Sequence, residues 1–566
     1  MSGFNRRALL RYSVLGAGAA LAGRPPQAVA GGGWSPYGGG LDQYVIDDTS
    51  AVADTDSGRV CGYIRNDVRI FKGIPYAEIL SPEGRWVRGA KVRPWGGMRS
   101  SRAAGLVCPP TIAPGGEQPL DEVLMRDSGN QPARSGEDCL RVNVWTPGTD
   151  NRRRQVLFYC HGGGFNNGSA LMSAMYEAHN LSRYGDVVVV SMTHRLNALG
   201  FLDLSAHGPR WAESPNLGML DIVDALKWVR TNIANFGGDP ARVMLFGHSG
   251  GGAKVAALLS MPEARGLFNR AVVQSPGPFP FASPAEAAAR TDTFLKLLGV
   301  APANVDALLK LPLEALMRAA GSITATANAA RDRFDLQGTA ADNVWRPVVD
   351  GRSLSYQPAE PTAASDVPLV IGTVLHEAFN ALGHPEYLQM KEPEARELVR
   401  GFFGPAGDSI YDVYRGAFPK VSPFEISAMA RAMGRMRSYC VKAAMNRAAL
   451  NSAPTYNYWV QWQSRNFQGR AMSHHEIEMP LVFLNSDAIP QFSGGTAEAR
   501  ALSLKMADSW LAFARSGDPN TPALPKWAPA TARGVSAMVF DNNCRIDPGS
   551  DLAAVEAFWK NRFHKA

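Results

Sequence analysis

Five short runs of apolar and β-branched residues recur along the chain, and they constrain its fold more than any other feature. The runs are QVLFYC (155–160), VVVVSM (187–192), RVMLFG (242–247), AVVQS (271–275) and PLVIGT (368–373). None of them alternates between apolar and polar residues. Continuous apolar strands are typical of parallel sheets that are covered on both faces. The runs therefore predict a central, mostly parallel sheet.

Helical periodicity lies between these strands. From Leu217 to Phe236 apolar residues return every three or four positions, and Gly237 and Gly238 follow as a stop signal. Strands that alternate with such helices predict an α/β fold with a doubly wound sheet. Two alanine-rich stretches, 284–335 and 384–450, interrupt the pattern, and we expect them to cap the carboxyl edge of the sheet.

The first 30 residues resemble an export signal rather than part of the fold. An arginine pair (Arg6 and Arg7) precedes a weakly apolar stretch, and AVA (28–30) offers a cleavage site. This order is typical of a twin-arginine signal, which predicts a periplasmic or secreted protein. A basic tail is the alternative. The apolar stretch is too short to span a bilayer, so we expect no stable membrane anchoring.

Charge and cysteine spacing exclude several classes of function. The chain of 566 residues has a formal charge of +7, and residues 1–30 hold four arginines and no acid, which leaves +3. This surplus is too small to predict a nucleic-acid partner. The six cysteines form no CxxC or Cys/His cluster with zinc spacing, so the sequence predicts neither a metal site nor a cofactor.

Ser249 is a candidate nucleophile. It lies in GHSGG (247–251), between an apolar strand and a helix, which is the context of the G-x-S-x-G turn that exposes a serine hydroxyl at the sheet edge. A plain glycine turn is the alternative. The glycine run in CHGGGFNNGS (160–169) also follows a strand, so the amides of Gly163, Gly164 and Gly250 are candidates for an oxyanion hole.

Seven motifs in a fixed order now make the chain similar to a known family. They are FKGIPYA (71–77), SGEDCLRVNVWTP (135–147), HGGGF (161–165), HRLNALGFL (194–202), NLGMLDIVDALKWVRTNIANFGGDP (216–240), the serine turn, and WLAFARSGDPNTPALPKW (510–527). The chain resembles the type-B carboxylesterase/lipase family, which includes cholinesterases and bacterial para-nitrobenzyl esterases. The resemblance implies one α/β-hydrolase domain over residues 31–566, after the signal.

The resemblance also implies the other catalytic residues. The family's acid corresponds to Glu377 in GTVLHEA (372–378), with Asp350 as the alternative acid. Its base corresponds to His475 in SHHEIEMPLVFL (473–484), three residues before Glu478, with His474 as the alternative base. We expect His248 and Phe165 to contact the substrate.

Several residues depart from the family pattern or extend it. His161 and His194 replace aromatic residues, and we expect them to pack or hydrogen-bond near the site. Lys254 replaces a small residue, with either a direct role or a structural ion pair to an acid of the core. The resemblance implies a disulfide between Cys108 and Cys139, and a less certain one between Cys440 and Cys544. Cys61 and Cys160 would remain free.

Together these features predict an exported serine carboxylesterase that acts on small-molecule esters through an acyl-enzyme. A catalytically inactive, cholinesterase-like binding protein is one alternative, and an amidase or lactonase that uses the same site is another. Most relatives have glutamate before the nucleophile, whereas this chain has His248. Loop 109–138 contains no aromatic residue for a cation–π contact. We therefore expect neutral or anionic esters to be preferred over choline esters. The oligomeric state stays open.

Overall fold

The central sheet is built from the predicted strands. The computed structural model describes residues 36–37, 42–112, 134–171, 173–277, 279–329, 344–358, 360, 366–382 and 384–563. Within them, twelve strands form one sheet in the order β1-β4-β5-β7-β9-β8-β10-β11-β12-β13-β14-β15. Their bounds are β1 (Tyr44–Val45), β4 (Tyr63–Arg65), β5 (Val68–Pro75), β7 (Arg141–Thr146), β9 (Val188–Thr193), β8 (Arg154–Cys160), β10 (Gly238–His248), β11 (Arg270–Gln274), β12 (Leu369–Val374), β13 (Thr455–Val460), β14 (Ala537–Phe540) and β15 (Arg545–Asp547). A smaller sheet contains β2 (Val52–Thr55), β3 (Gly58–Cys61) and β6 (Met98–Ser100).

The five apolar runs form neighbouring parallel strands, β9-β8-β10-β11-β12, as predicted. Antiparallel strands are confined to the two sides of the sheet. The register pairs Gly247 with Cys160, and His248 with Gln274. The residues that follow β8, β10 and β11 therefore emerge together at one edge, which brings the glycine run next to the serine turn.

Helices cover both faces of this sheet. The periodic stretch after Asn216 forms α4 (Leu217–Asn232) and a 3₁₀ turn (Ile233–Phe236), and it ends at Gly237 with φ 74°. Side chains alternate between two apolar clusters: Phe158 and Cys160 belong to one, and Leu157 and Tyr159 to the other. The first cluster includes side chains of α4, α5 (Gly250–Ser260) and α12 (Ser438–Ala449). The second includes side chains of α2 (His179–Gly185), α13 (Glu478–Val482) and α15 (Ala497–Ser516).

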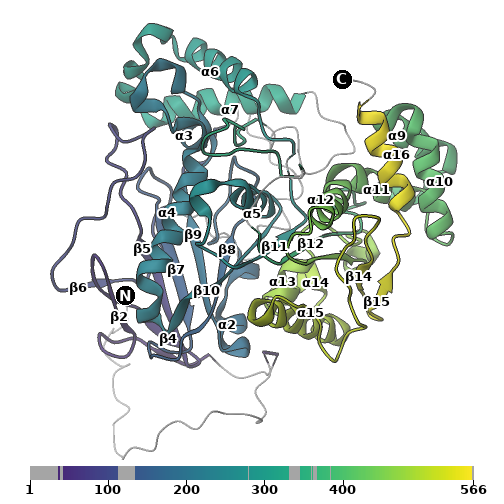
Figure 1. Ribbon diagram of the computed structural model, residues 1–566, viewed down its shortest axis with the longest axis horizontal. Helices are drawn as coiled ribbons and strands as arrows, with labels where there is room; N and C mark the ends of the chain where they lie inside the picture. Colours follow the sequence, from purple (N-terminus) through teal and green to yellow (C-terminus); the bar gives the residue numbers. More distant parts are fainter. Residues whose placement is uncertain are drawn as a thin grey trace, which may run out of the picture. The chain divides into compact units, whose positions relative to one another are not determined.

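The alanine-rich stretches form two helical groups (Figure 1). The first contains α6 (Pro284–Leu298) and α7 (Leu313–Ala329), which pack together beyond the upper ends of the central strands in the figure; residues 330–335 lie outside the described residues. The second contains α9 (Glu392–Phe403), α10 (Gly407–Ala417) and α11 (Pro423–Ala432), with α10 packed on the C-terminal α16 (Leu552–Phe563). In the same stretch α12 packs against β12 and β13, so it covers a face of the sheet rather than its edge.

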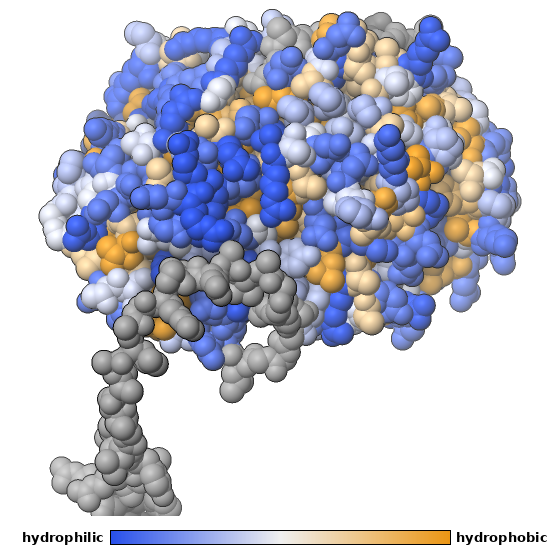
Figure 2. Space-filling model, turned by 60° about the horizontal axis from the view of Figure 1, so that its bottom comes forward, coloured by the Kyte–Doolittle hydropathy of each residue, from blue (hydrophilic) through white to orange (hydrophobic). Residues whose placement is uncertain are grey.

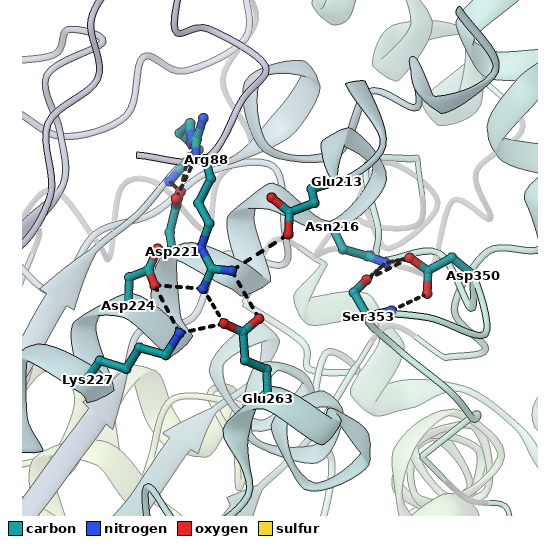
Figure 3. Close-up of polar contacts among 10 residues, drawn as sticks. Arg88, Glu213, Asn216, Asp221, Asp224, Lys227, Glu263, Asp350 and Ser353 are labelled. Atoms are coloured by element: carbon teal, nitrogen blue, oxygen red, sulfur yellow. Dashed lines mark hydrogen bonds and ion pairs between the residues drawn. The ribbon is translucent and has the colours of Figure 1, made fainter. Parts of the chain in front are cut away.

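Ion pairs fix α4 from its outer side. Arg88 binds Asp224 of α4 at 2.7 Å and Glu263 at 2.7 Å, and Lys227 joins the same two carboxylates (Figure 3). A buried pair, Arg195 with Asp221, holds the same helix at 2.6 Å. The face of the protein shown in Figure 2 is mostly hydrophilic, with apolar residues in small separate areas.

The two expected disulfides are absent, because all six cysteines are free thiols. Cys108 and Cys139 do lie together, and the pKa of the Cys139 thiol is raised, first by its hydrogen bond with Cys108 and then by burial. Cys440 and Cys544 belong to the apolar clusters on opposite faces of the sheet, which separates them. The resemblance therefore placed the first pair in contact correctly, but the second pairing is wrong in this structure.

The structure does not describe the residues on which the expected export depends. The export signal expected at residues 1–30 falls outside the described residues, and residues Gly39–Ala566 form one compact unit. Within the described part of the chain, no helix combines the length and the apolar character that crossing a bilayer requires.

Candidate active site

Ser249 lies on a strained turn at the carboxyl edge of the sheet. It separates β10 from α5 and has φ 59° and ψ −124°, a conformation that costs energy for a residue with a side chain. The turn is tight: a Cβ at Gly251 would lie 1.9 Å from the carbonyl oxygen of Cys160. Ser249 is partly exposed, whereas His248 and Gly250 on either side of it are buried. This is the geometry that the G-x-S-x-G turn requires.

The glycine run packs directly on this turn. A Cβ at Gly162 would lie 3.4 Å from the Cβ of Ser249, and one at Gly250 would lie 2.4 Å from the amide nitrogen of Gly164. Gly163 and Gly164 have φ values of 85° and 60°, which a side chain would disfavour. The structure thus brings together the three glycines expected to form an oxyanion hole, beside the serine that would need one.

Glu377 and His475 form a buried pair. Glu377 follows β12, His475 follows β13, and the Nδ1 of His475 hydrogen-bonds to the Glu377 Oε2. The amide of His475 also donates to the Glu377 carbonyl at 3.1 Å, and the amide of Val374 donates to Oε1 at 3.1 Å. With Nδ1–H directed to the carboxylate, Nε2 is left as the basic nitrogen. Burial lowers the pKa of His475, but Glu377, together with Glu476 and Glu478, raises it more, so the net pKa is above its ordinary value.

The alternative residues have other partners. His474 places its Nδ1 3.5 Å from Glu476 Oε2 and packs its ring on Phe492. Asp350 accepts from the Ser353 hydroxyl at 2.7 Å and from the Asn216 side chain at 3.3 Å, and Figure 3 shows these three residues bonded to one another. Both alternative residues therefore contact other partners, whereas Glu377 and His475 are hydrogen-bonded to each other.

His248 connects the serine turn to the histidine. Its Nε2–H donates to the backbone carbonyl of His475 at 2.8 Å, and the two rings are 4.4 Å apart. Burial lowers the pKa of His248 to about 3, which makes it neutral at pH 7. Among the described contacts no hydrogen bond joins the Ser249 hydroxyl to His475. His248, which precedes Ser249 in the chain and contacts His475, brings the two groups near each other.

The two residues expected to contact substrate are both buried. His248 is 2% exposed and Phe165 is 0% exposed. Phe165 packs against Phe201 and Phe281, with ring centroids 5.3 Å and 5.9 Å away. In this structure they support the site from behind rather than present an open surface. Of loop 109–138, only residues 109–112 and 134–138 are described.

Sequence reasoning missed a second carboxylate beside the pair. It treated Glu478 as a marker of register, but the side chain is fully buried and accepts hydrogen bonds from Tyr458 at 2.7 Å and from Gln274 at 3.1 Å. Burial raises the pKa of Glu478 to about 7, and the charge of Glu377 adds to the effect. Its position three residues after His475 in the motif was the sequence signal that it belongs to the site.

His161 and His194 pack against each other beneath the glycine run, as expected, with ring centroids 5.1 Å apart. Lys254 is fully buried, and its Nζ donates to the His161 carbonyl at 2.8 Å. The expected ion pair to a core acid is wrong: no carboxylate of the described residues pairs with Lys254. Nor do the described residues contain a group of three or more His, Cys, Asp or Glu side chains arranged to hold a metal.

A buried Glu–His pair, a strained serine and a glycine cradle at the carboxyl edge of a doubly wound sheet define an α/β-hydrolase of the serine class. The chain belongs to the carboxylesterase family, whose model matches residues 49–556, and it is a serine carboxylic-ester hydrolase.

Similar proteins agree with this assignment over almost their whole lengths. The para-nitrobenzyl esterase of Bacillus subtilis (strain 168) is 31% identical over 512 residues, which cover 89% of this chain and 98% of the relative. The phenmedipham hydrolase of Pseudarthrobacter oxydans is also 31% identical over 512 residues, covering 89% of this chain and 97% of the relative. The solved structure of a Clostridium hathewayi esterase that can hydrolyze aliphatic aromatic polyesters matches with a TM-score of 0.76 and 30% identity, covering 92% of this chain and 100% of that chain.

Proposed function

We propose that the enzyme hydrolyses carboxylic esters through a Ser249–His475–Glu377 triad. His475 Nε2 removes the proton of the Ser249 hydroxyl as its oxygen attacks the ester carbonyl, and Glu377 orients the imidazole and stabilises its charged form. The observation that carries the proposal is the buried hydrogen bond between His475 Nδ1 and Glu377.

The amides of Gly163, Gly164 and Gly250 would then bind the oxyanion of the tetrahedral intermediate. The intermediate collapses as His475 gives its proton to the leaving alcohol, which leaves an acyl group on Ser249. Water, deprotonated by His475, attacks this acyl-enzyme and releases the acid. Every proton transfer in the cycle thus passes through one imidazole nitrogen.

Ser249→Ala tests the mechanism. We expect kcat on a p-nitrophenyl ester to fall by at least about 10³-fold, because the triad acts as a unit. Circular dichroism and the Tm should stay close to the wild-type values, since alanine has the same Cβ as serine and leaves the strained turn unchanged. A folded Ser249→Ala protein that retains most of its activity would exclude Ser249 as the nucleophile.

We also propose that neutral or anionic esters are preferred over cationic ones. Two observations support this preference. The residue before the nucleophile is a buried, neutral histidine in place of the carboxylate usual in the family. In addition, the segment that follows β11 passes next to Ser249, since the Gly277 amide donates to the Ser249 carbonyl at 3.4 Å. This segment carries Phe279 and Phe281 rather than acids.

The preference can be measured as kcat/KM for butyrylthiocholine against an uncharged thioester of equal acyl length. We expect the uncharged thioester to be hydrolysed about tenfold more efficiently or better, since no carboxylate of the serine turn attracts the cation. Equal or higher efficiency on the choline compound would contradict the preference without affecting the triad.

A further inference from the structure

Lys254 is buried beside the serine turn, and no carboxylate of the described part of the chain balances its charge. It lies on α5 four residues after Gly250, so both face the same side of the helix. The side chain is 0% exposed, its Nζ donates to the His161 carbonyl at 2.8 Å, and it lies 5.7 Å from the centroid of the Phe165 ring. His161 and Phe165 are the two ends of the run that contains Gly163 and Gly164.

Among the described residues, no neighbouring group supplies a negative charge that would compensate Lys254. Burial raises the pKa of the Cys160 thiol to about 12, so it is not a thiolate at pH 7. Burial and the charge of Lys254 hold the pKa values of His161 and His194 well below their ordinary value, so both rings are neutral.

The acidic side chains on the described elements packed against α5 are paired with other residues. On α4, Asp221 is paired with Arg195 and Asp224 with Arg88. On β10, His248 is bonded to the His475 carbonyl, and Asp239 at the start of the strand is paired with Arg153. Arg154 of β8 is paired with Asp150, and Arg270 lies at the opposite end of β11. Among these described groups, Lys254 is thus the fully buried charge that has no carboxylate partner.

We propose that Lys254 is a positioning residue for ester hydrolysis. Its ammonium group holds the His161 carbonyl at the start of residues 161–165, which contain the oxyanion-hole glycines Gly163 and Gly164, and adds a positive charge next to them. The inference rests on the proposed function. A buried cation next to amides that receive an oxyanion favours the transition state over the neutral ester, because the field acts only as negative charge develops. A lysine kept there for packing alone would be inferior to methionine, since an unpaired buried charge destabilises a fold.

The charge on Lys254 depends on pH near neutrality. Burial lowers the pKa of Lys254 to about 7, so its contribution to catalysis is present below that pH and is lost as the pH rises through it. Stability follows the opposite course. Between about pH 7 and pH 10 the folded protein releases a proton that the unfolded chain keeps, so the wild-type protein gains stability as the pH rises.

The test compares Lys254→Met with the wild-type enzyme on a p-nitrophenyl ester. At pH 6.5 we expect kcat to fall by about 10-fold to 100-fold with KM nearly unchanged, and the ratio of wild-type to variant kcat to shrink towards pH 9. The Tm of the variant should exceed that of the wild type, most at pH 6.5 and least at pH 10. Lys296→Met, which removes an exposed lysine of α6, should leave all these quantities unchanged.

A kcat within about twofold of the wild type at pH 6.5, a ratio that does not change with pH, or a lower Tm would each overturn the proposal. If Lys254→Met does not fold, Lys254→Gln replaces it, since glutamine can still donate to the His161 carbonyl but carries no charge, and the same pH-dependent loss is expected. The proposed function is judged separately: it fails if Ser249→Ala stays active, whereas a normal Lys254 variant beside an inactive Ser249→Ala enzyme contradicts this inference alone.

Discussion

At the scale of single residues, the site combines groups that the fold would not keep for stability. Ser249 and Glu377 both have positive φ values, 59° and 50°, although neither is glycine. Glu377, Glu478 and Lys254 are fully buried ionisable side chains. Strained backbone and buried charge each cost free energy, and they persist where the surrounding structure over-determines them. These energetically costly groups lie close to Ser249, which is the pattern expected of an active site.

The two adjacent histidines offer a residue-level test. His475→Ala should lower kcat about as much as Ser249→Ala, because serine and base act as one unit. His474→Ala should cost less than about tenfold, since its ring contacts Glu476 and Phe492 rather than the pair. The measurement is kcat for both variants on the same ester. If His474→Ala were the more damaging change, the base would be His474 and the motif register would be displaced by one.

At the scale of secondary-structure elements, the close packing of α5 on β8 sets the geometry of the site. The helix starts immediately after Ser249, and its first turn lies against the end of β8 and the glycine run because Gly250 and Gly251 have no side chains. The oxyanion amides and the nucleophile therefore keep a fixed distance. A side chain in this turn would separate the elements rather than be accommodated at their surface.

Gly251→Ala tests this packing. Its Cβ would lie 1.9 Å from the Cys160 carbonyl oxygen, which belongs to rigid backbone, so we expect a loss of at least about 2 kcal/mol in stability together with most of the activity. Gly401→Ala is the matched control, because this exposed glycine of α9 has nothing within 4 Å of an added Cβ. It should be neutral or should stabilise by about 0.5–1 kcal/mol. Equal effects of the two substitutions on Tm would contradict the packing argument.

At the scale of the whole molecule, the fold rests on two apolar clusters, one on each face of the sheet, and on buried ion pairs such as Arg195–Asp221 and Arg437–Asp551. None of its cysteines is crosslinked. Export by a twin-arginine signal stays a prediction, as does secretion, since the residues concerned are not among those described. The described fold therefore contains no disulfide bond.

We expect dithiothreitol to leave the Tm of the purified enzyme unchanged within about 1 °C. A closed Cys108–Cys139 bond would stabilise the fold by about 3–4 kcal/mol through loop closure, so its reduction would be visible as a lower Tm. Cys108→Ala serves as a control, because it removes any such bond permanently. A drop in Tm on reduction that is absent from this variant would show that the pair is oxidised in the native enzyme.

The sequence by itself determined the sheet and the candidate site residues. A strand whose residues are all apolar must be covered on both faces, so the apolar runs predicted β8–β12. G-x-S-x-G after such a run predicted the turn that carries Ser249. The resemblance to a known family, rather than local pattern, indicated Glu377 and His475, which 98 residues separate.

Only the tertiary structure decided what surrounds them. It put His248 on the backbone of His475, gave Asp350 and His474 other partners, and left Lys254 without the acid that the sequence allowed. Burial and pairing are properties of residues distant in the chain, and the pKa values near Ser249 depend on both. For that reason the sequence could indicate which residues carry the chemistry, but not the charges that they carry.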